Sequence, residues 1–145
     1  MPVAFMIRIK NAGTKAIDVM KPVDGSEGLR YPIYSCVLTG PDGKRIPGNR
    51  RTCLYCNPLR KDDLLPLEPG EEFDPQLLEW WDTSLRNWVP TNVGKHKLRV
   101  TIDFSASDTN RWCGSGRNDV ATIRTLLERV PRQRLEATVD FEVVQ

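Results

Sequence analysis

The amino-acid sequence predicts an all-β protein, an antiparallel sandwich of about seven strands with one short helix before the last strand. Apolar residues recur at every second position in several segments, which is the period of a half-buried strand. Turn-forming Gly, Pro, Asn and Asp separate most of these segments. A parallel sheet would need a helix after most strands, and a clear helical period occurs near the C-terminus alone.

Length and composition fit one folded unit. The chain has 145 residues, of which 39% are hydrophobic and 28% charged, so it can bury a core and is not of the disordered class. We therefore expect a single domain over residues 1–145. Lys and Arg number 21 against 19 Asp and Glu, a net charge of +2, which argues against an obligate binder of polyanions.

The first half of the chain reads as strands joined by turns. Alternation over residues 3–10 predicts a strand that starts almost at once, and residues 16–20 predict a second. Residues 33–39 have the character of a central strand. The pair Asp42-Gly43 then predicts a hairpin, because Gly tolerates a positive φ.

The middle of the chain is less regular. Residues 47–63 are polar, basic and rich in turn formers, so we expect a long excursion there. Residues 64–67 resume a strand, and Pro69-Gly70 turns it back. Residues 73–89 fit a helix as well as a strand, and we favour a strand followed by one helical turn.

The second half carries the clearest patterns. Residues 97–104 alternate cleanly as a strand, and residues 105–118 predict a loop. Asp119 can cap the N-terminus of a helix that ends at Pro131. Residues 135–144 alternate again as the last strand. The apolar face of the helix consists of Val120, Ile123, Leu127 and Val130.

Several turn and strand motifs occur in an order that resembles a loose group of bacterial immunoglobulin-like sandwich domains. The motifs are Asn11-Ala12-Gly13, Pro69-Gly70-Glu71, Gly94-Lys95-His96-Lys97-Leu98 and Val139-Asp140-Phe141-Glu142-Val143. The resemblance spans nearly the whole chain and implies an immunoglobulin-like sandwich. Members of that group serve as accessory or adhesion domains beside enzymes, or as small inhibitors. The inserted helix and the cysteine-bearing loop depart from the pattern and are where a particular function would have been added.

Four cysteines allow three interpretations. Cys36, Cys53, Cys56 and Cys113 could form disulfides, could bind a structural zinc ion as four thiolates, or could remain reduced as small apolar side chains. A second Cys-x-x-Cys pair, the strong sign of a zinc site, is absent from the sequence. We therefore favour disulfides, gathered with the surrounding loop into a cysteine cluster.

Aromatic side chains are the candidate binding residues. Adjacent residues on a strand point to opposite faces, so Trp80 and Trp81 cannot both lie in a core if this segment is a strand. A group of exposed aromatic rings can form an interface hot spot. The candidate patch comprises Trp80, Trp81, Trp88, Trp112 and Tyr55. The other interpretation, and the more common case for tryptophan, is that the four indole rings pack in the core and at the rim of the sandwich.

Few residues of the sequence could act as catalytic groups. His96 is the sole histidine, so any Ser-His-Asp arrangement would have to use it, and Gly114-Ser115-Gly116 is not a nucleophile elbow. The basic residues of 44–61 are flanked by acidic ones, which favours a solvated loop over a nucleic-acid site. We therefore expect that the protein is not an enzyme, that it binds no cofactor beyond the possible zinc ion, and that it has no nucleic-acid partner.

The sequence thus predicts a non-enzymatic binding or accessory module, acting through loops and the aromatic patch. A protein partner is favoured over a carbohydrate. The alternatives are a structural component of a larger assembly, such as a surface or particle-decorating protein, and a small proteinase-inhibitor-like domain. Neither a signal peptide nor a run of apolar residues long enough to span a membrane is found in the chain, and the compartment stays open.

Overall fold

The computed structural model describes residues 3, 5–48, 55–77, 88–115 and 119–145. Within these ranges the protein is built mostly of strands in antiparallel sheets, with one short α-helix. The predicted all-β class is therefore confirmed. No helix in the described residues is long and apolar enough to cross a membrane.

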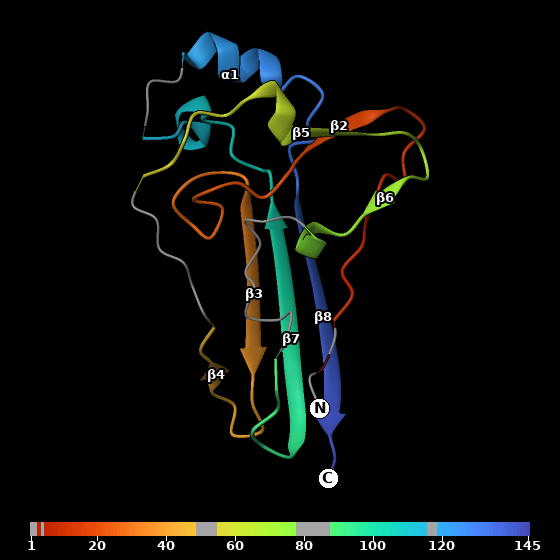
Figure 1. Cartoon of the computed structure of the whole chain (residues 1–145). Coiled ribbons are helices and arrows are strands. Elements are labelled where there is room, and N and C mark those ends of the chain that lie inside the picture. Colours follow the sequence, from red (N-terminus) through yellow and green to blue (C-terminus); the bar gives the residue numbers. More distant parts are fainter. Residues whose placement is uncertain (1–2, 4, 49–54, 78–87, 116–118) are drawn as a thin grey trace.

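The largest sheet has four strands in the order β4-β3-β7-β8 (Figure 1). Its strands are β3 (Ile33–Thr39), β4 (Arg45–Ile46), β7 (Gly94–Asp103) and β8 (Arg134–Val143). All three predicted long strands are present, because clean alternation gives each an apolar face. That face is buried in β3 and β7, whereas the residues of β8 are exposed or half-buried. In the register of the sheet, Cys36 faces Val100, and Leu98 faces Val139.

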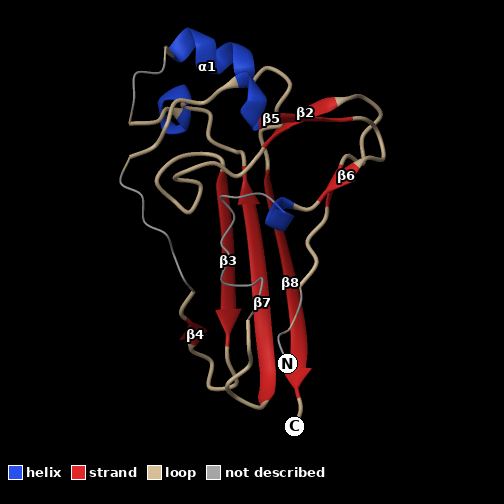
Figure 2. Cartoon of the chain, viewed as in Figure 1, coloured by secondary structure: helices blue, strands red, loops and turns tan. Residues whose placement is uncertain are grey.

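Two short ribbons lie beside the upper part of this sheet (Figure 2). One pairs β2 (Ile17–Met20) with β5 (Leu64–Leu67), and the other pairs β1 (Ile9–Lys10) with β6 (Glu72–Phe73). The strand expected from residue 3 onward forms ladder pairs only at its end, apart from a single bridge between Val3 and Trp88. The predicted alternation nevertheless persists, since Phe5 and Ile7 are half-buried.

The predicted hairpin joins β3 to β4. The Asp42 carboxylate accepts a hydrogen bond of 3.0 Å from the Lys44 N–H, and Gly43 has φ of 74°. This is the turn chemistry that Asp-Gly supplies. Further on, the expected strand and helical turn after residue 73 are represented by β6 and by the 3₁₀ helix η2 (Pro75–Leu77), while residues 78–87 lie outside the described part.

Two further 3₁₀ helices occur in segments predicted as loops. One is η1 (Lys61–Asp63), and the other is η4 (Thr109–Trp112), which begins after Asp108. The Asp108 carboxylate accepts a hydrogen bond of 2.9 Å from the Asn110 N–H. Such short helices have no apolar period of their own, so the sequence pattern shows only their polar residues.

The helix α1 (Val120–Leu126) confirms the predicted cap at Asp119 but ends before the predicted end at Pro131, so Leu127 and Val130 of the predicted apolar face lie beyond the helix. The Asp119 carboxylate accepts hydrogen bonds from the Ala121 N–H at 3.2 Å and from the Thr122 hydroxyl at 3.1 Å. These bonds hold the pKa of Asp119 below its usual value. Ile123 is fully buried, and Leu127 and Val130 are nearly so, because the helix covers the end of the core near η4.

We expect Leu127→Ala to lower the free energy of unfolding by about 2–5 kcal/mol, because it removes a side chain that is only 2% exposed and leaves a cavity. Leu29→Ala is the matched control, since Leu29 is 54% exposed, and should cost less than about 1 kcal/mol. Urea denaturation measures both. Equal losses would show that α1 does not close the core.

Candidate functional site

The cysteines do not form the expected cluster. Cys36 lies on β3 with its side chain in the core, whereas Cys56 and Cys113 lie in loops beyond the end of that strand. The Cys56 carbonyl accepts a hydrogen bond of 2.8 Å from the Ser115 N–H, so the two loops run close together. The expectation of one cluster is wrong for these residues, because the alternation of β3 directs Cys36 toward Val100 and the core.

No two of Cys36, Cys56 and Cys113 are joined by a disulfide, and Cys53 lies outside the described residues. The sequence favoured either two disulfides or one disulfide plus free thiols, and the first of these arrangements would require at least one such bond. Within the described ranges, no group of three or more His, Cys, Asp and Glu side chains could hold a metal ion. The site of a structural zinc ion is therefore not assembled by the three described thiols.

The expected aromatic patch is not formed by Trp112 or Trp88. Trp112 is fully buried, and its indole N–H donates a hydrogen bond of 3.0 Å to the Ala106 carbonyl. Trp88 is half-buried and packs against Phe5 and Phe141. Tyr55 is 57% exposed, and Trp80 and Trp81 lie outside the described residues. Trp112 belongs to the core because η4 turns it inward from an otherwise polar loop.

His96 belongs to the same aromatic group as Trp88. It is 2% exposed on β7, its ring stacks on Phe141 with centroids 5.4 Å apart, and its Nδ1 lies 2.8 Å from the Gly94 carbonyl oxygen. Its Nε2 is buried and has no hydrogen-bond partner among the described residues. The ring thus fills space between the sheet and Trp88 and is not presented to solvent.

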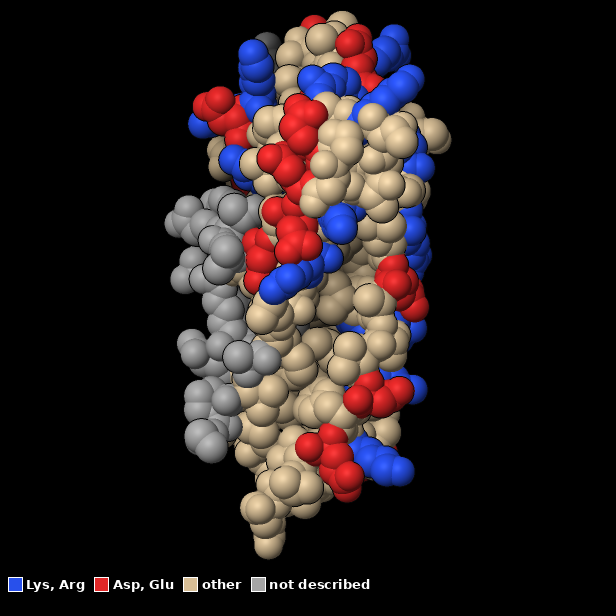
Figure 3. All heavy atoms as spheres, turned by 90° about the vertical axis from the view of Figure 1, so that its right-hand side faces the viewer, with Lys and Arg blue, Asp and Glu red and all other residues tan. Residues whose placement is uncertain are grey.

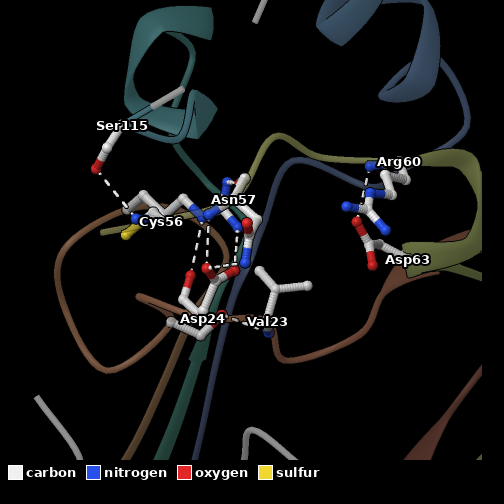
Figure 4. A network of polar contacts seen from close by, with 9 residues as sticks. Val23, Asp24, Cys56, Asn57, Arg60, Asp63 and Ser115 are labelled. Atoms are coloured by element: carbon white, nitrogen blue, oxygen red, sulfur yellow. Dashed lines mark hydrogen bonds and ion pairs between the residues drawn. The ribbon is translucent and has the colours of Figure 1, made fainter. Parts of the chain in front are cut away.

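A buried polar network connects the loops at the end of the sheet (Figure 4). The Arg30 guanidinium and the Asp24 carboxylate form an ion pair of 2.7 Å, with side chains only 3% and 6% exposed. The second carboxylate oxygen of Asp24 accepts hydrogen bonds from the Asn57 N–H at 2.6 Å and from its side-chain amide at 3.0 Å. Arg30 also donates to the carbonyl groups of Asp24 and Asn57.

No sequence pattern indicated this network. Gly25 and Gly28, at positive φ, allow the chain to fold back from Asp24 to Arg30, but Asn57 approaches from a distant segment. Both Asp24 oxygens are occupied, and burial of a paired, hydrogen-bonded charge is a structural arrangement. We therefore assign the network the role of holding the loops together and not that of a ligand site.

A trough along β8 is the better candidate site. We use the name β8 trough for the groove between the N-terminal segment, residues 5–10, and the core-side face of β7 and β8. Its volume is about 280 Å³, and a second hollow of about 420 Å³ continues it past Ile9, Lys10 and Leu135. Figure 3 views the side on which β8 lies and shows uncharged atoms around a hollow in the middle of this face.

The trough exists because β8 is a border strand. Ala137 and Val139 face Val100 and Leu98 across the ladder, so the four side chains project from one face of the sheet. Val100 and Leu98 are buried, whereas Ala137 is exposed and Val139 is 53% exposed. In the described part of the chain, no strand pairs with the other side of β8. An apolar strand face is thus left partly uncovered.

Charged side chains stand at the margins of the β8 trough. Arg8 and Lys10 lie on the N-terminal segment, and Glu136 lies on β8. Arg8 forms an exposed ion pair of 3.1 Å with Glu72. The sequence pattern identified both flanking segments as strands but not the groove between them, because neither pattern shows which strand lies at the border.

We expect Asp24→Asn to lower the free energy of unfolding by about 3–5 kcal/mol, since it leaves the buried Arg30 guanidinium without its counter-charge. Asp140→Asn provides the control, because Asp140 and Lys97 form an exposed pair at 3.7 Å that should contribute about 0–1 kcal/mol. Both values come from urea denaturation. A loss for Asp24→Asn no larger than that of the control would contradict the structural role of the network.

Comparisons with known proteins return no match. No family model matches the chain, and neither the curated proteins nor the solved structures include one that is similar to it. The function is therefore argued from the geometry of the β8 trough and its border strand.

Proposed function

We propose that this chain is a non-enzymatic binding module that takes an extended segment of a protein partner onto the side of β8 that pairs with no described strand. The observation that carries the proposal is the exposure of Ala137 and Val139 on the core-side face of that strand. The function is the one predicted from the sequence, but the surface differs. The trough replaces the loops and the aromatic patch.

A border strand supplies both affinity and selectivity to such a partner. Its outward N–H and C=O groups can pair with an added strand, and alternate side chains of that strand then point into the trough. β8 has ten residues, long enough for several pairs of hydrogen bonds. The fitting partner is a segment in which every second residue is apolar.

The charges at the margins refine the expected partner. Lys10 is exposed beside the trough, and Arg8 retains an exposed guanidinium there although it pairs with Glu72. Acidic residues on the partner would meet these cations, which favours correct orientation more than it adds affinity. A protein segment provides such charges together with backbone N–H and C=O groups that can pair with β8, whereas a carbohydrate has no peptide backbone to add to the sheet. No cofactor takes part in this mode of binding.

We also propose that the four-stranded sheet and the two ribbons make up an immunoglobulin-like sandwich. Support comes from the ribbons β1-β6 and β2-β5, whose buried Ile9, Val19 and Leu67 belong to the same core as the sheet. The trough then lies at the open side between the two layers. A structural role in a larger assembly is the second candidate function, since a free border strand also suits repeated pairing.

We expect peptides selected from a random display library by this protein to alternate apolar and polar residues. Val139→Lys should weaken their binding at least about tenfold, because it places a charge at the trough. Thr138→Lys is the matched control, since Thr138 is exposed on the opposite face of β8, and should leave binding nearly unchanged. Fluorescence anisotropy measures the affinities, and circular dichroism confirms that both variants fold.

The proposal fails if the library yields no binding peptide. It also fails if the selected peptides bind Val139→Lys as tightly as they bind Thr138→Lys. Either result would show that the trough is not the binding surface.

A further inference from the structure

We propose that the segment which pairs with the outer side of β8, at the margin of the β8 trough, is β8 of a second copy of this chain, arranged antiparallel about a two-fold axis at Ala137. The inference rests on the proposed function, because it names the partner of the same surface. The observation behind this inference is that the outer face of β8 carries charges of both signs, from Arg134 on one hand and from Glu136, Asp140 and Glu142 on the other. Charges of one sign would keep two such strands apart.

The register about Ala137 makes the two strands complementary on both faces. On the outer face, Arg134 of each copy lies opposite Asp140 of the other, and Glu136 lies opposite Thr138. On the trough side, Leu135 lies opposite Val139, and Ala137 lies opposite its own counterpart, whose small side chain allows close approach. Opposite charges and apolar side chains in facing positions each stabilise an antiparallel pair.

Neighbouring registers are less complementary. An axis at Thr138 places Arg134 opposite Glu142 but also Glu136 opposite Asp140, each twice, and an axis at Val139 places Glu136 opposite Glu142 twice. An axis at Leu135 places Arg134 opposite Glu136, but only three strand residues of each copy then face each other. An axis at Glu136 or Asp140 places that carboxylate opposite itself. Like charges in facing positions destabilise a pair, so the outer face of β8 selects the register about Ala137.

The side chains that would pair are available. Arg134 is 60% exposed and Asp140 is 75% exposed, and their bonds within the chain, to Glu136 at 3.6 Å and to Lys97 at 3.7 Å, are long and solvated. Such surface pairs contribute little, so both side chains can turn toward the second copy. Pairing would join the two four-stranded sheets into one and cover the exposed Val139 of each copy.

Sedimentation equilibrium over a dilution series tests the pairing in the full chain. The wild-type protein should form dimers, and Asp140→Arg should raise the dissociation constant at least about tenfold, because it creates two like-charge contacts with Arg134. The double variant Arg134→Asp with Asp140→Arg should restore the dimer, because the opposite charges then face each other again. Glu68→Arg makes the same charge change in the exposed turn after β5, away from β8, and should leave the dimer intact.

Cross-linking tests the axis directly. Ala137→Cys should form a disulfide between two copies on mild oxidation, and mass spectrometry should identify a peptide joined to itself at position 137. Thr138→Cys is the control and should not cross-link in this way, because its facing residue is Glu136. The inference would be overturned if Asp140→Arg left the dissociation constant of the dimer unchanged and if no cross-link formed through position 137.

The outcomes separate this inference from the proposed function. The protein could stay monomeric at every concentration and still bind display peptides, with Val139→Lys abolishing that binding. This result would overturn the second copy as the partner but would leave the proposed binding module in place. A monomer that also yields no display peptide overturns both.

Discussion

The border position of β8 is the constraint on which the account depends. A strand inside a sheet has neighbours on both sides, and its apolar face is covered by the layer above. β8 has a neighbour on one side in the described part of the chain, and its Ala137 and Val139 lie half outside the cover that buries Leu98 and Val100. The trough follows from this position, and so does the row of β8 backbone groups that pairs with no strand among the described residues.

Elsewhere in the described part of the chain, apolar side chains are covered and polar groups are paired to a greater extent than at β8. The helix α1 and the 3₁₀ helix η4 bring Ile123 and Trp112 into the core at one end of the sheet. The buried Asp24–Arg30 pair connects the loops at that end, and every oxygen of the Asp24 carboxylate is used. Tyr34 adds a further link, since its hydroxyl donates a hydrogen bond of 2.6 Å to the Met20 carbonyl, and burial raises its pKa. These contacts stabilise the fold at the end of the sheet and do not involve the exposed side of β8.

Sequence patterns predicted the elements well where a period could be read. The strands β3, β7 and β8 and the capped helix α1 follow from alternation, from Asp-Gly turn chemistry and from the cap at Asp119. Features that depend on distant segments could not be read in this way. The polar residues around Trp112 do not show whether its ring is buried or belongs to an exposed patch, and the spacing of the cysteines does not show which face of its strand Cys36 occupies. The trough depends on strand order, which no local pattern contains.

Hydrogen exchange of the β8 amide groups, followed by NMR in dilute monomeric protein and again at high concentration or with a selected peptide, tests the central claim most directly. The account predicts that alternate amides of β8, those that point away from β7, exchange rapidly in the free monomer and become protected on binding. The amides that pair with β7 should be protected in both states. Slow exchange of every β8 amide in the free monomer would contradict the account, because the far side of the strand would then already be covered.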